Sequence, residues 1–237
     1  MILQTKTYLL LIGVVLLLVS APAVPAQTES GHKLVEFQMA LLKHGPKWTD
    51  AQNAEMKRLH DEHLNYVSSL FDSGKAIIAG PFTDGGEITG VYVLRAQSAA
   101  EAKAWVEADP VVAAGLLVAE MHPWWSEDIF SKPAKPLKLV PMYFVLLTRG
   151  EKWTADQTPA IEEIQKAHLA NIRRLAEMKK LIAAGPFGDD GRLRGIFVFR
   201  AASLDEAKAL TATDPAVQAG RLAMELHTWM VPEGVLP

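Results

Sequence analysis

Two histidines at matching positions of a repeated sequence are the first candidates for chemistry. His63 and His168 are 105 residues apart, and each is followed 46 residues later by an aspartate, Asp109 or Asp214, that precedes a proline. A histidine can act as a general acid or base near neutral pH, and an aspartate can fix its tautomer and favour the imidazolium. These four residues are therefore the candidate catalytic residues.

Both residue types also have a structural explanation. His63 lies in a stripe with the spacing of one apolar helix face, so its ring could simply be packed in a core. An aspartate before a proline is the usual start of a short helical turn, where the carboxylate caps the helix. Capping and catalysis are compatible because a carboxylate has two oxygens. The sequence leaves these alternatives open.

The other polar residues and motifs of the sequence do not predict a bound metal or cofactor. His60, Glu62 and His63 have a spacing that a metal site on a helix face could use, but the second copy carries Gln165 and Ala167 at the first two places. We see no nucleophile elbow, phosphate-binding loop or dinucleotide fingerprint. We therefore expect neither a metal nor a cofactor.

Three further residues of the first copy have an identical residue at the matching position of the second copy, and these could line a site. We expect the two histidines that end the last strands to close a barrel rim rather than bind ligand, and the two arginines at strand ends to be solvated rather than to anchor an acidic substrate. The tryptophans at the helix entrances are equally ambiguous. These pairs are His122 and His227, Arg95 and Arg200, and Trp48 and Trp153.

The repeat itself determines the domain organisation. At the shift of 105, roughly 36 of about 88 aligned positions are identical. This period is too long for a solenoid repeat and matches one small domain. We predict a first domain at 34–125, a linker rich in proline and lysine at 126–138, and a second domain at 139–230.

Each copy contains the signals for strand, helix, strand, strand, helix, strand. Thr49 and Thr154, three residues before a glutamine, predict capping boxes that open the first helix, and Ser98 and Ser203, three before a glutamate, predict them for the second. Gly74 is a good end for the first helix. Lys179 occupies that place in the second copy, so we expect that helix to end by another route.

The predicted order is that of a split βαβ, or ferredoxin-like, domain of the α+β class. In such a domain both helices cover one face of the sheet, yet the strands at 91–94 and 196–199 are apolar on both faces. We infer that the free faces of the two copies cover each other. The chain should be a tandem of βαββαβ domains that forms an intrachain pseudo-dimeric α+β barrel, without need of a second chain.

Composition and the first residues bear on location and partners. The 237 residues carry a formal charge of −3 and no cysteine, with no basic cluster that would predict a nucleic-acid partner. Lys6, an apolar run at 8–19 and a small-residue site ending at Ala26 predict a signal peptide at 1–26. The mature protein should be periplasmic or secreted, with no stable membrane insertion; an uncleaved membrane tether is the alternative.

The chain resembles the YCII-related (YciI-like) domains. The resemblance rests on the order and spacing of five features in both copies, which in the first are His63-Leu64, Gly80-Pro81, Asp84-Gly85, Asp109-Pro110 and Pro123-Trp124. It implies a dimeric α+β barrel with an active centre of His and Asp, which falls on His63 with Asp109 and on His168 with Asp214. Members of the family are linked to chlorinated or dihydroxylated aromatic compounds, and the wider superfamily includes muconolactone isomerases and monooxygenases.

Two hypotheses follow for the function. The first is an exported, cofactor-free acid-base enzyme of lyase, isomerase or dehydrohalogenase type that acts on a small cyclic or aromatic compound. It predicts an Asp carboxylate within hydrogen-bond reach of each histidine and a ligand-sized cavity that reaches each histidine. The alternative is a non-catalytic protein, either a small-ligand-binding or a structural α+β barrel, in which the histidines are packed without access to solvent.

Overall fold

The two halves of the sequence fold into two copies of one domain. In the computed structural model, which describes residues 33–237, the first copy consists of β1 (Leu34–His44), α1 (Ala54–Asp72), β2 (Ala76–Pro81), β3 (Ile88–Leu94), α2 (Ala99–Glu107), α3 (Pro110–Ala113) and β4 (Leu117–Glu127). The second copy repeats this order as β5 (Leu139–Arg149), α4 (Pro159–Glu177), β6 (Leu181–Pro186), β7 (Leu193–Phe199), α5 (Leu204–Thr211), α6 (Pro215–Gln218) and β8 (Leu222–Pro232).

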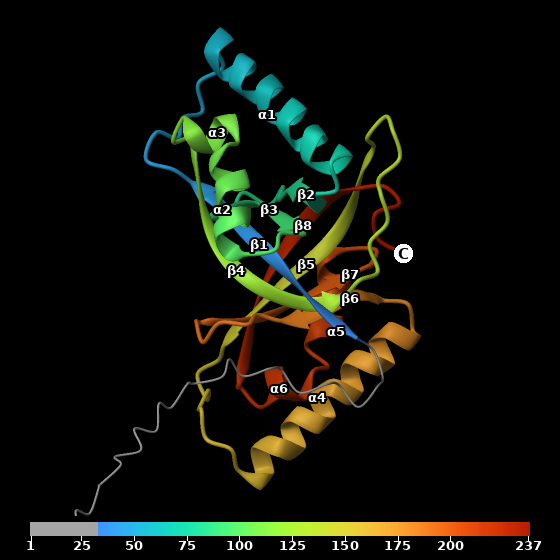
Figure 1. The fold of residues 1–237 in the computed structure, drawn as a ribbon. Helices are drawn as coiled ribbons and strands as arrows, with labels where there is room; N and C mark the ends of the chain where they lie inside the picture. The colour runs from blue at the N-terminus through green and yellow to red at the C-terminus, as the bar shows by residue number, and fades with distance from the viewer. Residues whose placement is uncertain (1–32) are drawn as a thin grey trace, which may run out of the picture.

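Each copy forms one antiparallel sheet of four strands. The strand orders are β2-β3-β1-β4 and β6-β7-β5-β8, and the helices of the two copies lie on opposite sides of the strands (Figure 1). The edge strand β2 lies beside β8, and β4 lies beside β6, so the sheets meet at both edges. This arrangement confirms the predicted tandem ferredoxin-like fold and the intrachain pseudo-dimeric α+β barrel.

The strands with two apolar faces explain how the sheets meet. Val91 and Val93 belong to one core formed between the sheets, together with Ile196 and Val198 from the second copy. The alternate residues of the same strand, such as Tyr92, face the helices and belong to a separate core in each copy. Because successive strand residues point to opposite faces, both sets must be apolar.

Glycines at the seams allow the edges to approach closely. A Cβ atom on Gly80 would lie 1.8 Å from the Met230 carbonyl oxygen, and one on Gly185 would lie 1.8 Å from the Trp125 carbonyl oxygen. Across the same seams, the indole nitrogens of Trp229 and Trp124 donate to the Gly80 and Gly185 carbonyls, at 3.1 and 3.2 Å. The Gly-Pro-Phe segments that follow the second strand of each copy are thus the contacts between the copies.

The first helix of each copy begins later than the predicted capping boxes. The side chain of Asn53 caps α1 by accepting from the Met56 amide at 2.9 Å, and Thr158 caps α4 by accepting from the Ile161 amide at 3.3 Å. Thr49 and Thr154 instead accept from amides two residues ahead, which closes a turn and prevents them from capping a helix. The capping boxes predicted there were wrong, whereas Ser98 and Ser203 do cap α2 and α5.

The two long helices end in the same way despite different residues. Gly74 has φ of 71° and Lys179 has φ of 57°, so both occupy the left-handed region one residue after the C-cap. The expectation that α4 ends by another route was therefore wrong. The amides of Lys179 and Lys180 donate to carbonyls of the last helical turn, which holds the exposed Lys179 in a conformation that glycine adopts without steric cost.

The predicted signal peptide at 1–26 lies outside the described residues. Among helices within 33–237, none is long and apolar enough to cross a membrane.

Candidate functional site

The structure brings His63 and Asp109 together. His63 lies in the middle of α1 and Asp109 directly precedes α3, and Nδ1 of the histidine is 2.9 and 3.0 Å from the two carboxylate oxygens. The side chain of Asp109 is fully buried, whereas that of His63 is 21% exposed. The pair therefore joins the middle of a long helix to the start of a short one, with the histidine on the side open to solvent.

Asp109 is held by more than the histidine. Its Oδ1 accepts from the Val111 amide at 3.1 Å, which caps α3, and its Oδ2 accepts a short hydrogen bond from the Tyr92 hydroxyl on β3. Burial and the negative charge of Asp109 raise the pKa of Tyr92, so this hydroxyl keeps its proton and remains a donor. Capping and the contact with histidine thus coexist on one carboxylate.

The second copy repeats the pair with one difference. His168 Nδ1 is 2.7 Å from Asp214 Oδ2, and Asp214 Oδ1 accepts from the Ala216 amide at 2.8 Å. Phe197 stands where the first copy has Tyr92, and its ring lies 6.0 Å from that of His168. Asp214 is fully buried and His168 is 13% exposed, so the second pair lacks the phenol donor and is slightly more enclosed.

The other ring nitrogen decides what these histidines can do. Within residues 33–237, Nε2 of His63 and Nε2 of His168 form no hydrogen bond, and neither atom is buried. When Nδ1–H of the neutral ring donates a hydrogen bond to the aspartate, Nε2 carries the lone pair. Each pair therefore presents an oriented proton acceptor to solvent.

The other two repeated histidines occupy the seams between the copies. His122 Nδ1 is 2.6 Å from Asp189 Oδ2, and His227 Nδ1 is 2.9 Å from Asp84 Oδ2, so each histidine pairs with the hairpin of the opposite copy. His227 also stacks on Phe82, with ring centroids 4.3 Å apart. The Nε2 atoms of both histidines are buried, and each lies near a carboxylate of its own strand, Glu120 Oε1 at 3.2 Å from His122 and Glu225 Oε1 at 3.3 Å from His227. Their surroundings are those of residues that join the two sheets at the barrel rim.

The remaining sequence candidates are separate from the histidine pairs. Arg95 forms a bidentate ion pair with Asp128, with N–O distances of 2.7 and 2.9 Å. Arg200 donates to the Pro237 carbonyl. The rings of His60 and His63 are 6.4 Å apart, and Trp48 stacks on His44 at 3.9 Å. Trp153 is surrounded by arginines.

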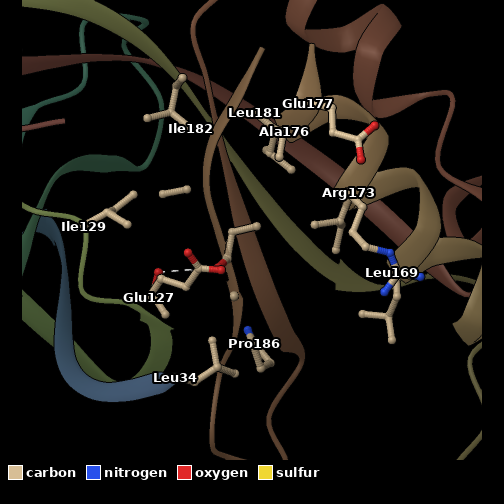
Figure 2. Close-up of a pocket in the computed structure, with 15 residues that line it drawn as sticks. Leu34, Glu127, Ile129, Leu169, Arg173, Ala176, Glu177, Leu181, Ile182 and Pro186 are labelled. Carbon is tan, nitrogen blue, oxygen red and sulfur yellow. Dashed lines mark hydrogen bonds between the residues drawn. The ribbon is translucent and has the colours of Figure 1, made fainter. Parts of the chain in front are cut away.

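Two surface cavities lie beside the sheets, and neither is lined by His63 or His168. The more apolar one, of about 380 Å³, lies between α4, β6 and the end of β4 (Figure 2). Arg173 and Glu177 occupy its α4 side, while Leu34 and Ile129 lie opposite. The expected cavity reaching each histidine is therefore not formed by either of these two.

Sequence reasoning missed Tyr92 and the seam aspartates. Tyr92 could have been found from the sequence, because alternate residues of β3 face the helices and Tyr92 is one of them. The second copy has phenylalanine at the matching position. Asp84 and Asp189 looked like simple turn residues, and no local signal shows that their carboxylates meet a histidine more than 60 positions away.

Comparison with known proteins supports the fold and the family. The chain resembles a haem-binding protein from Thermus thermophilus, with a TM-score of 0.53 at 14% identity over 84% of this chain and 93% of the other. It also resembles a chlorite dismutase variant from Candidatus Nitrospira defluvii, with a TM-score of 0.55 at 12% identity over 84% and 92%. At such identities the likeness concerns the fold alone. Comparison with curated proteins gives no match.

The family is established by the sequence over both copies. The profile of the YCII-related domain matches residues 37–124 and again residues 142–229, which together make up most of the chain. The two matched segments each contain one His and Asp pair and residues from all four strands of one sheet. This chain therefore belongs to the YCII-related domain family and carries two tandem copies of its domain.

Proposed function

We propose that this chain is a cofactor-free acid-base enzyme of lyase, isomerase or dehydrohalogenase type, acting on a small cyclic or aromatic compound. One observation carries the proposal: in both copies a buried aspartate holds Nδ1 of a histidine whose Nε2 is open to solvent. A structural core histidine needs partners for both nitrogens, as His122 and His227 have, whereas within residues 33–237 His63 and His168 have a partner for Nδ1 alone.

The arrangement suits a proton shuttle at Nε2. The aspartate accepts a hydrogen bond from Nδ1–H, which leaves the lone pair on Nε2 to take a proton from an acidic C–H or O–H group of a substrate. The imidazolium that forms is stabilised by the buried carboxylate 2.7 to 3.0 Å away. The same histidine can return the proton to another atom or to a leaving group. The amides of Val111 and Ala216 hold the carboxylates in place during the transfer.

A haem does not fit the residues of the apolar cavity. The haem-binding neighbour raises this question, since a haem iron is held by a His, Cys, Met or Tyr side chain. The lining of the 380 Å³ cavity contains none of these. Haem therefore has no part in the proposed reaction.

We also propose that the protein acts outside the cytoplasm, with domains at 34–125 and 139–230. Export rests on the sequence of residues 1–26, and the domain limits rest on the repeat.

Turnover tests the proposal. Purified mature protein would be incubated with a panel of chlorinated, dihydroxylated and lactone compounds, and loss of each compound followed by chromatography. We expect turnover that falls at least about a hundredfold in the His63→Gln, His168→Gln double variant. The matched control is His44→Gln, because the His44 ring stacks on Trp48 and belongs to neither His and Asp pair. Turnover unchanged in the double variant would contradict the assignment.

A second candidate, binding of a small apolar ligand without catalysis, is favoured by the cavity beside α4. Ala176 lines it, and the matching residue of the first copy is the larger, buried Phe71. Under this alternative, Ala176→Phe abolishes ligand binding while the histidine double variant retains it. The acid-base proposal predicts that the histidine variants lose turnover whatever Ala176→Phe does.

A further inference from the structure

Three arginines of the second copy surround one tryptophan. The guanidinium carbons of Arg149, Arg194 and Arg221 lie 5.3, 4.6 and 4.9 Å from the ring centroid of Trp153. They come from the end of β5, from β7 and from the residue before β8, and the tryptophan lies in the loop that leads to α4. Residues from four separate segments thus converge, and we call them the arginine cluster.

The cluster lacks the partners that would neutralise it. Arg149 donates to the Asp190 carbonyl at 2.6 Å, Arg194 to the Asp189 carbonyl at 3.4 Å, and Arg221 to the Thr154 carbonyl at 3.2 Å. All three acceptors are backbone oxygens. Within residues 33–237, no carboxylate oxygen lies within 4 Å of these guanidinium nitrogens.

An unpartnered guanidinium nitrogen of Arg221 and the charges around Arg194 indicate a site for an anion. Nη1 of Arg221 is buried and has no hydrogen-bond partner in the described chain. The pKa of Arg194 is lowered by burial and then by the charge of Arg149, and the charges of Asp190 and Asp189 only partly oppose this. The Asp189 carboxylate is itself committed to His122 at 2.6 Å. Like charges gathered around buried donors are typical of an anion site.

The first copy shows that the fold does not require the cluster. At the positions that match the three arginines it carries His44, Thr89 and Leu116, and among the described residues the ring that stacks on Trp48 is that of His44. The tryptophan is thus kept in both copies, whereas the three cations are confined to the second. A purely structural role in supporting the tryptophan would not need all three.

We propose that the arginine cluster binds an oxyanion of the phosphate class, either free or as the phosphate group of a small molecule. Planar guanidinium groups donate pairs of N–H bonds that match the oxygens of a tetrahedral anion, and the anion would neutralise the repulsion between the arginines. The site is separate from the histidine pairs and does not depend on their proposed function.

Inorganic phosphate is the probe. Each substitution replaces an arginine by the residue at the matching position of the first copy. Thermal unfolding and calorimetric titration of the mature protein would be measured with phosphate from about 0.1 to 10 mM, against sodium chloride of equal ionic strength. We expect a saturable rise in Tm and measurable heat with phosphate alone. Arg194→Thr and Arg149→His, which install the first-copy residues, should each weaken phosphate binding at least about tenfold.

The same variants separate binding from packing. If the cluster is an anion site, Arg194→Thr leaves Tm unchanged or raises it when phosphate is absent, because a repulsive charge is removed. Arg200→Thr, outside the cluster, should keep the response to phosphate. The proposal is overturned if phosphate and chloride have the same effect on the Tm of the wild type. It is also overturned if both variants have a lower Tm than the wild type without phosphate and phosphate does not change the Tm of the wild type. Arg149 is exposed, so Arg149→His keeps the test valid should Arg194→Thr fail to fold.

Discussion

The Tyr92 hydroxyl donates a hydrogen bond to Asp109, the carboxylate that also holds His63, and no such donor reaches Asp214 in the described part of the second copy. The two sites therefore share the His and Asp pair but differ in how the carboxylate is supported. The carboxylate of Asp109 is therefore positioned by one more hydrogen-bond donor than that of Asp214.

Removing the phenol tests this difference. Tyr92→Phe should lower the free energy of unfolding by about 1 to 3 kcal/mol, since a buried bond to a charged acceptor is lost. Phe197 shows that the ring without hydroxyl fits the fold. Urea unfolding would measure the change, with Tyr143→Phe as control because the Tyr143 hydroxyl makes no hydrogen bond within the described chain. Equal stabilities for Tyr92→Phe and wild type would show that the bond contributes nothing.

Replacing Lys179, which has a left-handed backbone conformation after α4, should stabilise the protein. Lys179→Gly should raise the free energy of unfolding by about 1 kcal/mol, because glycine adopts a φ of 57° without the steric cost paid by lysine. The opposite change at the matching site, Gly74→Lys, should lower it by a similar amount. Denaturant unfolding of both variants checks the pair, and a loss of stability in Lys179→Gly would refute this explanation.

Closure of the barrel should depend on the seam glycines. Gly80→Ala or Gly185→Ala would place a Cβ 1.8 Å from a backbone carbonyl of the other copy, so the seam must open. We expect losses above about 3 kcal/mol in stability and exposure of the seam tryptophans, visible as a red shift in fluorescence. Gly86→Ala, whose Cβ would meet only side-chain atoms at 3.3 Å or more, is the control. Unchanged unfolding of Gly80→Ala would mean that the sheets do not close as described.

Acid stability should depend on Glu120. A hydrogen bond from Lys43, 3.0 Å away, is the main cause that lowers the pKa of Glu120. Since the folded pKa lies below the unfolded value, near 4.5, the interaction stabilises the protein above that pH and is lost as the pH falls through the folded pKa. The effect should be at most about 1 kcal/mol because both side chains are partly exposed.

Comparing unfolding at pH 7 and at acid pH measures this effect. Lys43→Met should be less stable than wild type at pH 7, and the difference should shrink in acid. Lys57→Met, which removes an exposed pair with Asp61, is the control. A difference that is the same at both pH values would argue against the assigned cause.

The repeat allowed the sequence to predict most of the fold and to identify the His and Asp pairs, because each copy gives the same strand, helix and turn signals. Other features depend on contacts that no local pattern encodes. The partner of His122 comes from the opposite copy, and Asn53 rather than Thr49 caps α1 because Thr49 closes its own turn. The arginine cluster joins segments more than 60 residues apart and is absent from the first copy, so the repeat could not reveal it.

The central claim is that Nε2 of His63 and Nε2 of His168 are accessible bases whose tautomer is set by aspartate. Nitrogen-15 NMR of the histidine rings in the mature protein, assigned with His63→Gln and His168→Gln, tests it most directly. We expect both neutral rings to carry the proton on Nδ1, and their signals to shift when dihydroxylated aromatic acids are added. Rings that carry the proton on Nε2, or that respond to none of these ligands, would contradict the account and favour a packed, structural role.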